Sequence, residues 1–314
     1  MSFHHVSVMP EETIAALLTD KNGTYVDCTL GGAGHAKILA DSLTEQGRLV
    51  GIDQDAAAIE AGAARLKNTR CRVDIVRANF AELGTVLKNL QINEVTGVLF
   101  DLGISSPQID NAERGFSYMQ NARLDMRMDT RREVSAYELV NNLSAAELTQ
   151  IFFRYGEERH AKRIADFIVK RREKAPLVTT GELVETIEAA VPLKFRRQKH
   201  GHVAKRVFQA LRIAVNDELN IIPAAIQTAV NHLAPGGRLA VITFHSLEDA
   251  AVKHTLKDLS TGCICPPDIP VCVCHHKAQI KIIGKALCPT REEILANPRA
   301  KSAKLRVAEK LPTN

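Results

Sequence analysis

Short apolar runs alternate with amphipathic stretches along the first part of the chain. Four of these runs have the apolar, β-favouring composition of buried strands, and they begin at residues 24, 48, 73 and 97. A stretch with helical spacing of apolar positions follows most of them. Strands that alternate with helices in this way predict a mostly parallel sheet with helices on its faces.

The pattern becomes helical from about residue 135 and returns to α/β near residue 207. Polar capping residues such as Ser144 and Thr179 precede the predicted helices. Those helices span residues 136–140, 145–155, 161–172 and 180–190. The returning pattern predicts a helix over 207–228, a strand over 239–243 and an alternating last strand at the sheet edge within 297–308.

These patterns predict an α/β fold with a Rossmann-like, mostly parallel sheet and an inserted α-helical domain. The first part of the core covers residues 1–112, and the inserted domain, which would bind substrate, covers 113–206. The second part of the core covers 207–314 and contains a cysteine-bearing loop at 260–288. An irregular stretch from Asn111 to Asp129 has no clean period, which is typical of a functional loop or lid.

A glycine-rich turn joins the first strand to the helix that follows it. Gly31, Gly32 and Gly34 let the backbone approach a ligand, and Asp27 stands at the end of the strand before them. About one βαβ step later, Asp53 ends the second strand, where a carboxylate accepts hydrogen bonds from ribose hydroxyls. For Asp55 an N-cap role in the next helix is favoured. Together these features predict an adenosine-containing cofactor.

Three further positions at strand ends are candidate site residues. Asp101 ends the fourth strand and should face the cleft, because parallel sheets place their chemistry at the carboxyl ends of the strands. Phe80 either stacks on an adenine ring or anchors the next helix by apolar packing. His245 either contacts substrate or lies beside a helix cap formed by Ser246 with Asp249.

The charge distribution favours a polyanionic partner. The net charge is +5 over 314 residues, and no acidic residue occurs between Val191 and Asn216. Trp is absent, so a nucleic-acid contact would depend on Lys and Arg rather than on base stacking. The alternative is a solvated basic loop. The candidate RNA-binding residues are Lys194, Arg196, Arg197, Lys199, Lys205 and Arg206.

The chain has no apolar run near 18 residues and no signal-peptide pattern, so we expect a cytoplasmic protein without a membrane span.

Four of the seven cysteines form two C-x-C pairs near the end of the chain. Cys263, Cys265, Cys272 and Cys274 could hold zinc in a four-sulfur site. The usual spacing in zinc sites is C-x₂₋₄-C, so the alternative, a reduced loop without metal, is favoured. A disulfide framework is not expected in a cytoplasmic chain.

Eight sequence blocks in register give the chain a family resemblance. It resembles the ribosomal RNA small subunit methyltransferase H family, S-adenosylmethionine-dependent enzymes that methylate N4 of a cytidine in bacterial small-subunit (16S) rRNA. One departure is His202-Val203-Ala204, where a His-Pro-Ala stretch is expected. The matching blocks are residues 27–35 (DCTLGGAGH), 101–108 (DLGISSPQ), 113–119 (ERGFSYM), 124–129 (LDMRMD), 155–159 (YGEER), 208–213 (FQALRI), 244–249 (FHSLED) and 297–300 (NPRA).

The resemblance implies a class I methyltransferase fold and a set of site residues. Asp101 would be the polar anchor between cofactor and substrate, with Ser105, Ser106 and His245 as candidate contacts to the base. The stretch 105–108 lacks the second proline and the aromatic residue common in amino-methylating enzymes. The cofactor positions would be Asp27, Ala33, Gly34, His35, Asp53, Phe80, Asp101 and Gln108.

The partner implied by the resemblance is small-subunit rRNA, either free or in an assembled small ribosomal subunit. The resemblance does not fix the oligomeric state, and a homodimer stays open. Two alternative functions are a ribosome-assembly or RNA-binding factor that retains a cofactor fold, and an amino-group methyltransferase for another substrate.

Overall fold

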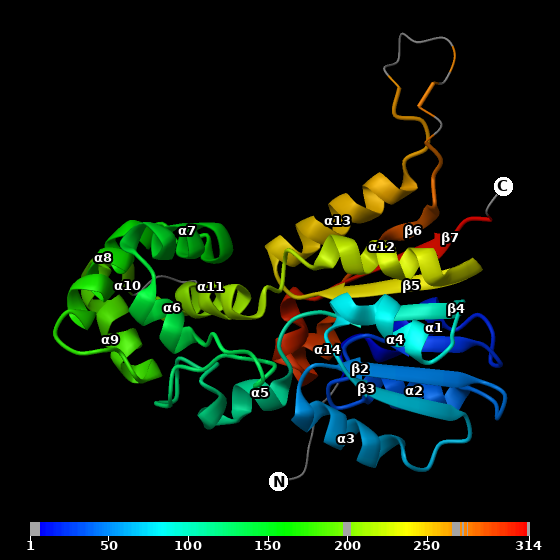
Figure 1. Ribbon diagram of the computed structural model, residues 1–314, viewed down its shortest axis with the longest axis horizontal. Coiled ribbons are helices and arrows are strands. Elements are labelled where there is room, and N and C mark those ends of the chain that lie inside the picture. Colours follow the sequence, from blue (N-terminus) through cyan, green and yellow to red (C-terminus); the bar gives the residue numbers. More distant parts are fainter. Residues whose placement is uncertain (1–6, 197–201, 266–270, 272, 275, 313–314) are drawn as a thin grey trace. The chain divides into compact units, whose positions relative to one another are not determined.

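The computed structural model divides into two compact units, each of which is described by itself. One unit comprises Met1–Gly103 with Leu219–Asn314, and the other is Ile104–Glu218. The structure describes residues 7–196, 202–265, 271, 273–274 and 276–312 (Figure 1). No described helix is long and apolar enough to cross a membrane.

The first unit is built on a seven-stranded sheet with the order β3-β2-β1-β4-β5-β7-β6. Strands β1 to β5 are parallel, whereas β7 is antiparallel to both of its neighbours. The strand order reverses between β1 and β4, which is where open α/β sheets bind ligands. The strands are β1 Thr24–Asp27, β2 Arg48–Asp53, β3 Arg72–Arg77, β4 Val95–Asp101, β5 Leu233–Thr243, β6 Ile280–Leu287 and β7 Lys304–Lys310. The predicted Rossmann-like sheet is confirmed.

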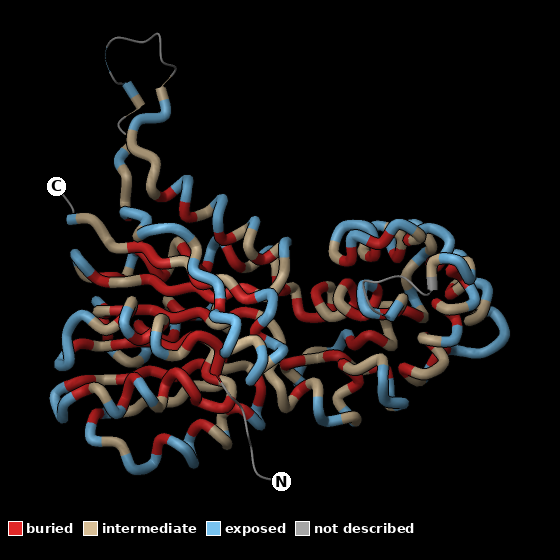
Figure 2. Tube along the Cα trace, turned by 180° about the vertical axis from the view of Figure 1, so that it is seen from behind, coloured by how far each residue is buried: buried red, intermediate tan, exposed pale blue. Residues whose placement is uncertain are grey.

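Helices cover both faces of this sheet because successive strand residues point to opposite sides. Tyr25 and Val26 are both fully buried, but Tyr25 packs with helices of one face and Val26 with those of the other. One face carries α4 (Leu83–Asn89), α12 (Ile222–His232) and α13 (Ser246–Ser260). The other carries α1 (Pro10–Leu17), α2 (Gly34–Ser42) and α3 (Ala56–Leu66). Figure 2 shows the buried positions running along the strands.

Short elements complete this unit at its turns. The 3₁₀ turn η1 (Phe80–Glu82) precedes α4, and α14 (Arg291–Ala296) with η3 (Pro298–Ser302) precedes β7. Asp55 caps α3 by accepting a hydrogen bond from the backbone N–H of Ala57 at 3.1 Å. The predicted N-cap role of Asp55 is therefore confirmed.

The second unit is helical and has its own hydrophobic core. Phe152, Ile164, Leu183 and Leu211 are fully buried there, on four different helices. Its helices are α5 Ser106–Asp110, α6 Ala136–Asn142, α7 Ala145–Gly156, α8 Ala161–Arg172, α9 Thr180–Ala190, α10 Leu193–Arg196 and α11 Ala204–Asn216, with the 3₁₀ turn η2 at Ala112–Arg114. The four helices predicted between 136 and 190 are confirmed, and Ser144 and Thr179 cap α7 and α9 as expected.

The helical unit extends beyond the predicted bounds of 113–206 at both ends. Ile104 packs against its core, and Phe208 and Leu211 of α11 belong to that core. The single helix expected over 207–228 is wrong, because Asp217 adopts a left-handed conformation (φ 54°) that ends α11. Pro223 then stands in the first turn of α12, where proline is well tolerated.

The tail strand lies inside the sheet rather than at its edge. Strand β7 pairs with β5 on one side and with β6 on the other. Strand β6 falls within the expected cysteine-bearing loop at 260–288, because its mostly exposed side chains and Gly284 (φ +64°) obscure the strand pattern. The edge strand is therefore β6.

The irregular stretch predicted to be a loop or lid is packed into the helical unit. Leu124 and Met126 are fully buried in its core, and Phe116 is nearly so. The Arg114 guanidinium donates hydrogen bonds to the carbonyl oxygens of Arg127 and Met128, at 2.9 and 3.1 Å. Phe116, Leu124 and Met126 therefore serve packing, and they do so in a segment that is neither helix nor strand.

Candidate functional site

Three carboxylates end three adjacent parallel strands at the switch point of the sheet. Asp27 ends β1, Asp53 ends β2 and Asp101 ends β4. Asp27 is only 2% exposed, and the side chain of Asp101 is 16% exposed. We call these residues, together with His35, the carboxylate cluster.

The glycine turn is held against the end of β2. Gly31 (φ +48°) donates its backbone N–H to Asp53 Oδ2 at 2.8 Å, and Leu30 donates to the carbonyl of Ile52 at 2.9 Å. Gly34 begins α2, and a Cβ there would lie 1.8 Å from the Ser7 hydroxyl oxygen. The turn therefore needs glycine at position 34 for a close approach and at position 31 for its backbone conformation.

His35 is buried in the first turn of α2 and faces Asp101. Its Nε2 lies 2.8 Å from the carbonyl oxygen of Val8, and its Nδ1 lies 3.5 Å from Asp101 Oδ2. A carbonyl oxygen only accepts, so Nε2 carries a proton. In a neutral ring the lone pair of Nδ1 would then point at a carboxylate. The arrangement therefore favours the doubly protonated imidazolium.

The pKa of His35 agrees with this geometry. Burial alone would lower it, but the hydrogen bond and the charge of Asp101, followed by the charge of Asp27, raise it above its ordinary value. The ionised ring therefore adds a positive charge among three carboxylates.

Burial disfavours the ionised forms of the other two carboxylates. It raises the pKa of Asp27 to about 6, against the lowering effects of His35 and of the Thr29 backbone N–H. It also raises the pKa of Asp53 to about 6, although N–H groups of Asp55 and Gly31 hydrogen-bond to it. Mutual repulsion among the carboxylates adds to the rise for Asp27. The cluster would thus be stabilised by an additional cation.

The cluster fits a cationic adenosine cofactor. Asp101 Oδ1 is buried and, among the described residues, has no hydrogen-bond partner. Buried polar atoms nearly always have a hydrogen-bond partner, so a buried oxygen without one indicates a place for a ligand. The sulfonium and ammonium groups of S-adenosylmethionine are positive, while the three carboxylates and one imidazolium leave the site negative above pH 6. Asp53, at the end of the second strand, stays the candidate for the ribose.

Thr29 supports the carboxylate cluster, and the sequence pattern did not single it out. Its hydroxyl oxygen accepts the backbone N–H of Asp101 at 2.6 Å, and its own backbone N–H donates to Asp27 Oδ1 at 3.1 Å. It therefore ties the ends of β1 and β4 together. Its place inside the 27–35 block was the one feature of the sequence that pointed to Thr29. The hydrogen bond to Asp101 depends on which strands pair, and the sequence does not reveal that pairing.

Phe80 packs on the edge of the sheet core. Its ring meets Phe100 edge-on, with centroids 5.7 Å apart, and it contacts the apolar core formed by α4 and α12. Phe80 is half-buried, and the contacts it makes are those of the second alternative, apolar packing at the start of the next helix. Stacking on adenine stays a prediction for the exposed part of the ring.

His245 caps the helix that follows β5. Its Nδ1 accepts the backbone N–H of Glu248 at 3.4 Å, and its Nε2 lies 3.0 Å from Glu248 Oε1. Glu248 is 1% exposed and also accepts the backbone N–H of Phe244. The cap is therefore His245 with Glu248, one position earlier than the Ser246–Asp249 alternative. Asp249 instead pairs with Lys304 and Arg306. Contact of His245 with substrate stays a prediction.

Ser105, Ser106 and Gln108 belong to the helical unit. Gln108 is 7% exposed, and its Oε1 accepts the backbone N–H of Ser105 at 3.1 Å, which closes the start of α5. Ser105 and Ser106 are half-buried. Their contacts to cofactor or base stay predictions, because the two units are described separately.

The basic residues of the helical unit divide into exposed and structural groups. Lys194, Lys205 and Arg206 are exposed, although Arg206 also donates to the carbonyl of Glu157 at 3.2 Å. Arg172 is structural, since it donates to the carbonyls of Val140 and Leu143 at the end of α6. Arg196 ends α10, and Arg197 and Lys199 lie outside the described residues.

Comparison with known proteins adds a family match over nearly the whole chain. The model described as the MraW methylase family matches residues 2–311. A Brevibacillus brevis protein named ribosomal RNA small subunit methyltransferase H is 51% identical over 312 residues, covering 99% of each chain. A Clostridium botulinum (strain Loch Maree) protein of the same name is also 51% identical, over 99% of this chain and 100% of that one.

A solved Streptococcus thermophilus structure described as an rRNA methylase overlaps the chain at a TM-score of 0.42 and 11% identity. The overlap covers 96% of this chain and 94% of that one. A similarity of this size adds nothing to the family match.

We predict that His35 titrates above its ordinary pKa in the cofactor-free protein and that Asp101→Asn brings the value down. The substitution removes the carboxylate that offsets the effect of burial. Because the pKa is raised, the pair stabilises the fold fully below the ordinary value of about 6.5 and loses its effect as pH rises through the raised pKa. Ring resonances followed by NMR against pH give the value.

Asp74→Asn is the matched control, since it removes a carboxylate of the same unit that pairs with Arg48 and Arg72. It should leave His35 unchanged. An identical His35 pKa in the wild type and Asp101→Asn would contradict the ion pair.

Proposed function

Because the chain belongs to the MraW methylase family, it is a methyltransferase, and we propose that it methylates N4 of a cytidine in small-subunit (16S) rRNA. The observation that carries the proposal is the carboxylate cluster at the switch point, which lies inside the family match. S-adenosylmethionine supplies an electrophilic methyl group on a sulfonium cation. The residues of the cluster would hold that cation and its ribose.

Three members of the cluster, with Thr29 beside them, would have distinct parts in binding. Asp53 would accept hydrogen bonds from the ribose while it continues to fix the Gly31 turn. His35 keeps Asp101 in place from one side, and the Thr29 hydroxyl fixes the Asp101 backbone from the other. Asp101 Oδ1 is then left to accept a hydrogen bond or to face a positive charge at the junction of cofactor and substrate.

Methyl transfer to a cytosine amino group depends more on aligning the nitrogen with the methyl group than on a strong base. The N4 amino group of cytosine is a weak nucleophile, because its lone pair is delocalised into the ring. Accepting an N–H hydrogen bond while fixing the nitrogen in line with the methyl group lowers the barrier, and a dry pocket strengthens that interaction. We assign the anchoring role to Asp101, with Ser105, Ser106 and His245 as contacts to the base.

The target base must leave its stack before it can react. Unstacking costs a few kcal/mol and is easiest in unpaired RNA. The helical unit offers exposed cations for the flanking phosphates, among them Lys194 and Lys205. Phosphate contacts position the RNA without reading its sequence, so the choice of nucleotide would rest on the fit at the pocket.

Transfer of a labelled methyl group tests this function directly. The enzyme, labelled S-adenosylmethionine and small ribosomal subunits that lack native modifications should give label on N4 of a single cytidine, mapped by mass spectrometry. Free rRNA serves as the second substrate. Asp101→Asn should lower the rate by about 10²-fold or more, whereas Asp74→Asn should not. Cofactor binding without transfer to either substrate would favour the assembly-factor alternative.

The basic positions predict a change in the salt dependence of RNA binding. Replacing both Lys194 and Lys205 by Ala should weaken binding and make the slope of log K against log salt shallower by about 1 per lysine, because fewer counterions are released. The double variant Lys67→Ala/Lys88→Ala, which removes two exposed lysines of the other unit, is the charge-matched control. Equal slopes for the two double variants would remove Lys194 and Lys205 from the RNA contact.

A further inference from the structure

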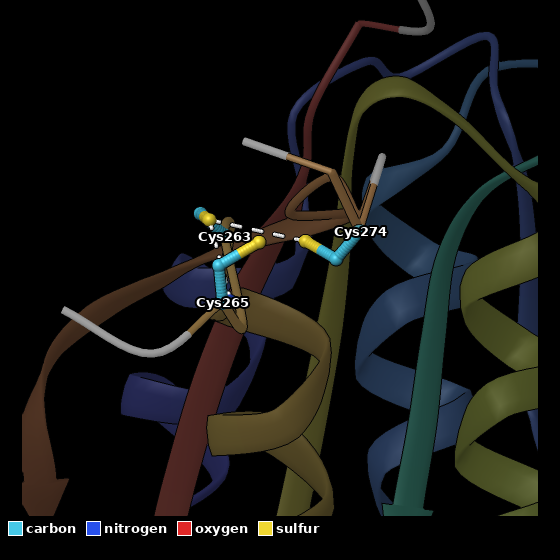
Figure 3. Close-up of side chains that lie close together, drawn as sticks. All are labelled: Cys263, Cys265 and Cys274. Carbon is cyan, nitrogen blue, oxygen red and sulfur yellow. Dashed lines mark hydrogen bonds between the residues drawn. The ribbon is translucent and has the colours of Figure 1, made fainter. Parts of the chain in front are cut away.

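The loop between α13 and β6 brings three cysteine side chains together. Cys263 and Cys265 lie on the limb that leaves α13, and Cys274 lies on the limb that returns toward β6. Their sulfur atoms all lie within 4.8 Å of one another, and Figure 3 shows the three side chains converging. Cys272, which the sequence analysis groups with them, lies outside the described residues. The loop is remote in sequence from the carboxylate cluster and has no part in it.

The spacing of the sulfurs fits a shared metal ion and not a disulfide. Cys263 Sγ and Cys274 Sγ are 3.8 Å apart, whereas bonded sulfurs are about 2.05 Å apart. Two thiolates on one tetrahedral zinc, each about 2.3 Å from the ion, would be about 3.8 Å apart. The Cys263–Cys274 pair thus has the separation of two zinc ligands, and Cys265 Sγ lies within 4.8 Å of both sulfurs.

Backbone N–H groups point at each of the three sulfurs. A thiol sulfur is a weak acceptor, whereas a thiolate bound to a metal is commonly supported by hydrogen bonds from its surroundings. Four donors at 3.4 Å for three sulfurs therefore indicate a backbone arranged around negative sulfur. The contacts are Ile264 N and His276 N to Cys274 Sγ, Cys265 N to Cys263 Sγ, and Val273 N to Cys265 Sγ.

The large apolar side chains among the described residues of the loop do not pack between its limbs. They are in solvent: Ile264 is 60% exposed, Val271 70% and Val273 64%. A metal crosslink can hold chain segments together where apolar packing is small. At its base, His276 Nδ1 lies 2.6 Å from the carbonyl oxygen of Gly262, which links the same two limbs.

We propose that Cys263, Cys265 and Cys274 bind one Zn²⁺ that crosslinks the two limbs of this loop. Three thiolates select a soft or borderline ion, and zinc takes such ligands in four-coordinate structural sites without redox chemistry. The ion joins the limbs where the described apolar side chains do not, so its role is structural. The proposal does not depend on the methyltransferase function.

Metal content tests the proposal. The full-length protein, purified under reducing conditions without chelator, should carry about one zinc per chain by elemental analysis. Cys263→Ser and Cys274→Ser should each lower the content more than tenfold. Cys288→Ser removes an exposed cysteine outside the cluster and should retain the zinc. Binding of S-adenosylmethionine, unchanged in all three variants, would show that the sheet unit is folded in each.

Cobalt(II) in place of zinc gives a second readout. It should produce an intense thiolate-to-cobalt charge-transfer absorption that is lost in Cys274→Ser and kept in Cys288→Ser. Two outcomes would overturn the proposal: a wild-type protein that neither carries zinc nor takes up added Zn²⁺ with its thiols reduced, or a Cys288→Ser variant that loses metal as completely as Cys274→Ser.

Discussion

The crowding of carboxylates at three adjacent strand ends is the constraint on which the site depends. Parallel pairing of β2, β1 and β4 brings Asp53, Asp27 and Asp101 to one edge of the sheet. Burial raises the pKa of Asp27 most, and repulsion from Asp101 and Asp53 adds to the rise. The protein offsets these two effects only in part, through His35 and through the Thr29 backbone N–H. A bound cation would relieve the remainder, so the burial and crowding that disfavour the ionised carboxylates in the free site would strengthen ligand binding.

The turn and its supporting contacts explain how the cluster is kept in place. Thr29 links the β1 turn to the backbone of Asp101, and Gly31 links the turn to Asp53. Two strand ends are thereby fixed through one short loop. Because each link uses a backbone N–H, the geometry does not depend on long side chains that lose rotamer freedom on ordering. The helical unit has a hydrophobic core of its own, separate from the two clusters that flank the sheet.

The sequence predicted the elements whose signal is local. The glycine turn, the acids at strand ends and the four helices between 136 and 190 follow from spacing and composition, and the structure has them. Edge strand β6 was missed, because a strand with mostly exposed side chains and Gly284 in its middle carries little apolar pattern. The break at Asp217 was also missed, since the apolar pattern continues across it.

The contacts that define the site could not be predicted because they join residues distant in sequence. Thr29 with Asp101, and His35 with both Val8 and Asp101, depend on which strands become neighbours. The cap of His245 with Glu248 is a local contact, and the expected Ser246–Asp249 cap differs from it by one residue in where α13 begins. Cysteine spacing likewise favoured a loop without metal, whereas the positions of the sulfurs and of the N–H groups around them favour an ion.

The central claim is that the carboxylate cluster binds a positively charged cofactor. The most direct measurement compares calorimetric dissociation constants of S-adenosylmethionine and of S-adenosylhomocysteine, which lacks the sulfonium charge, between pH 5 and pH 7.5. Asp27 and Asp53 ionise near pH 6, so preference for the charged ligand should grow by about tenfold across this range. A preference that stays constant with pH would contradict the account.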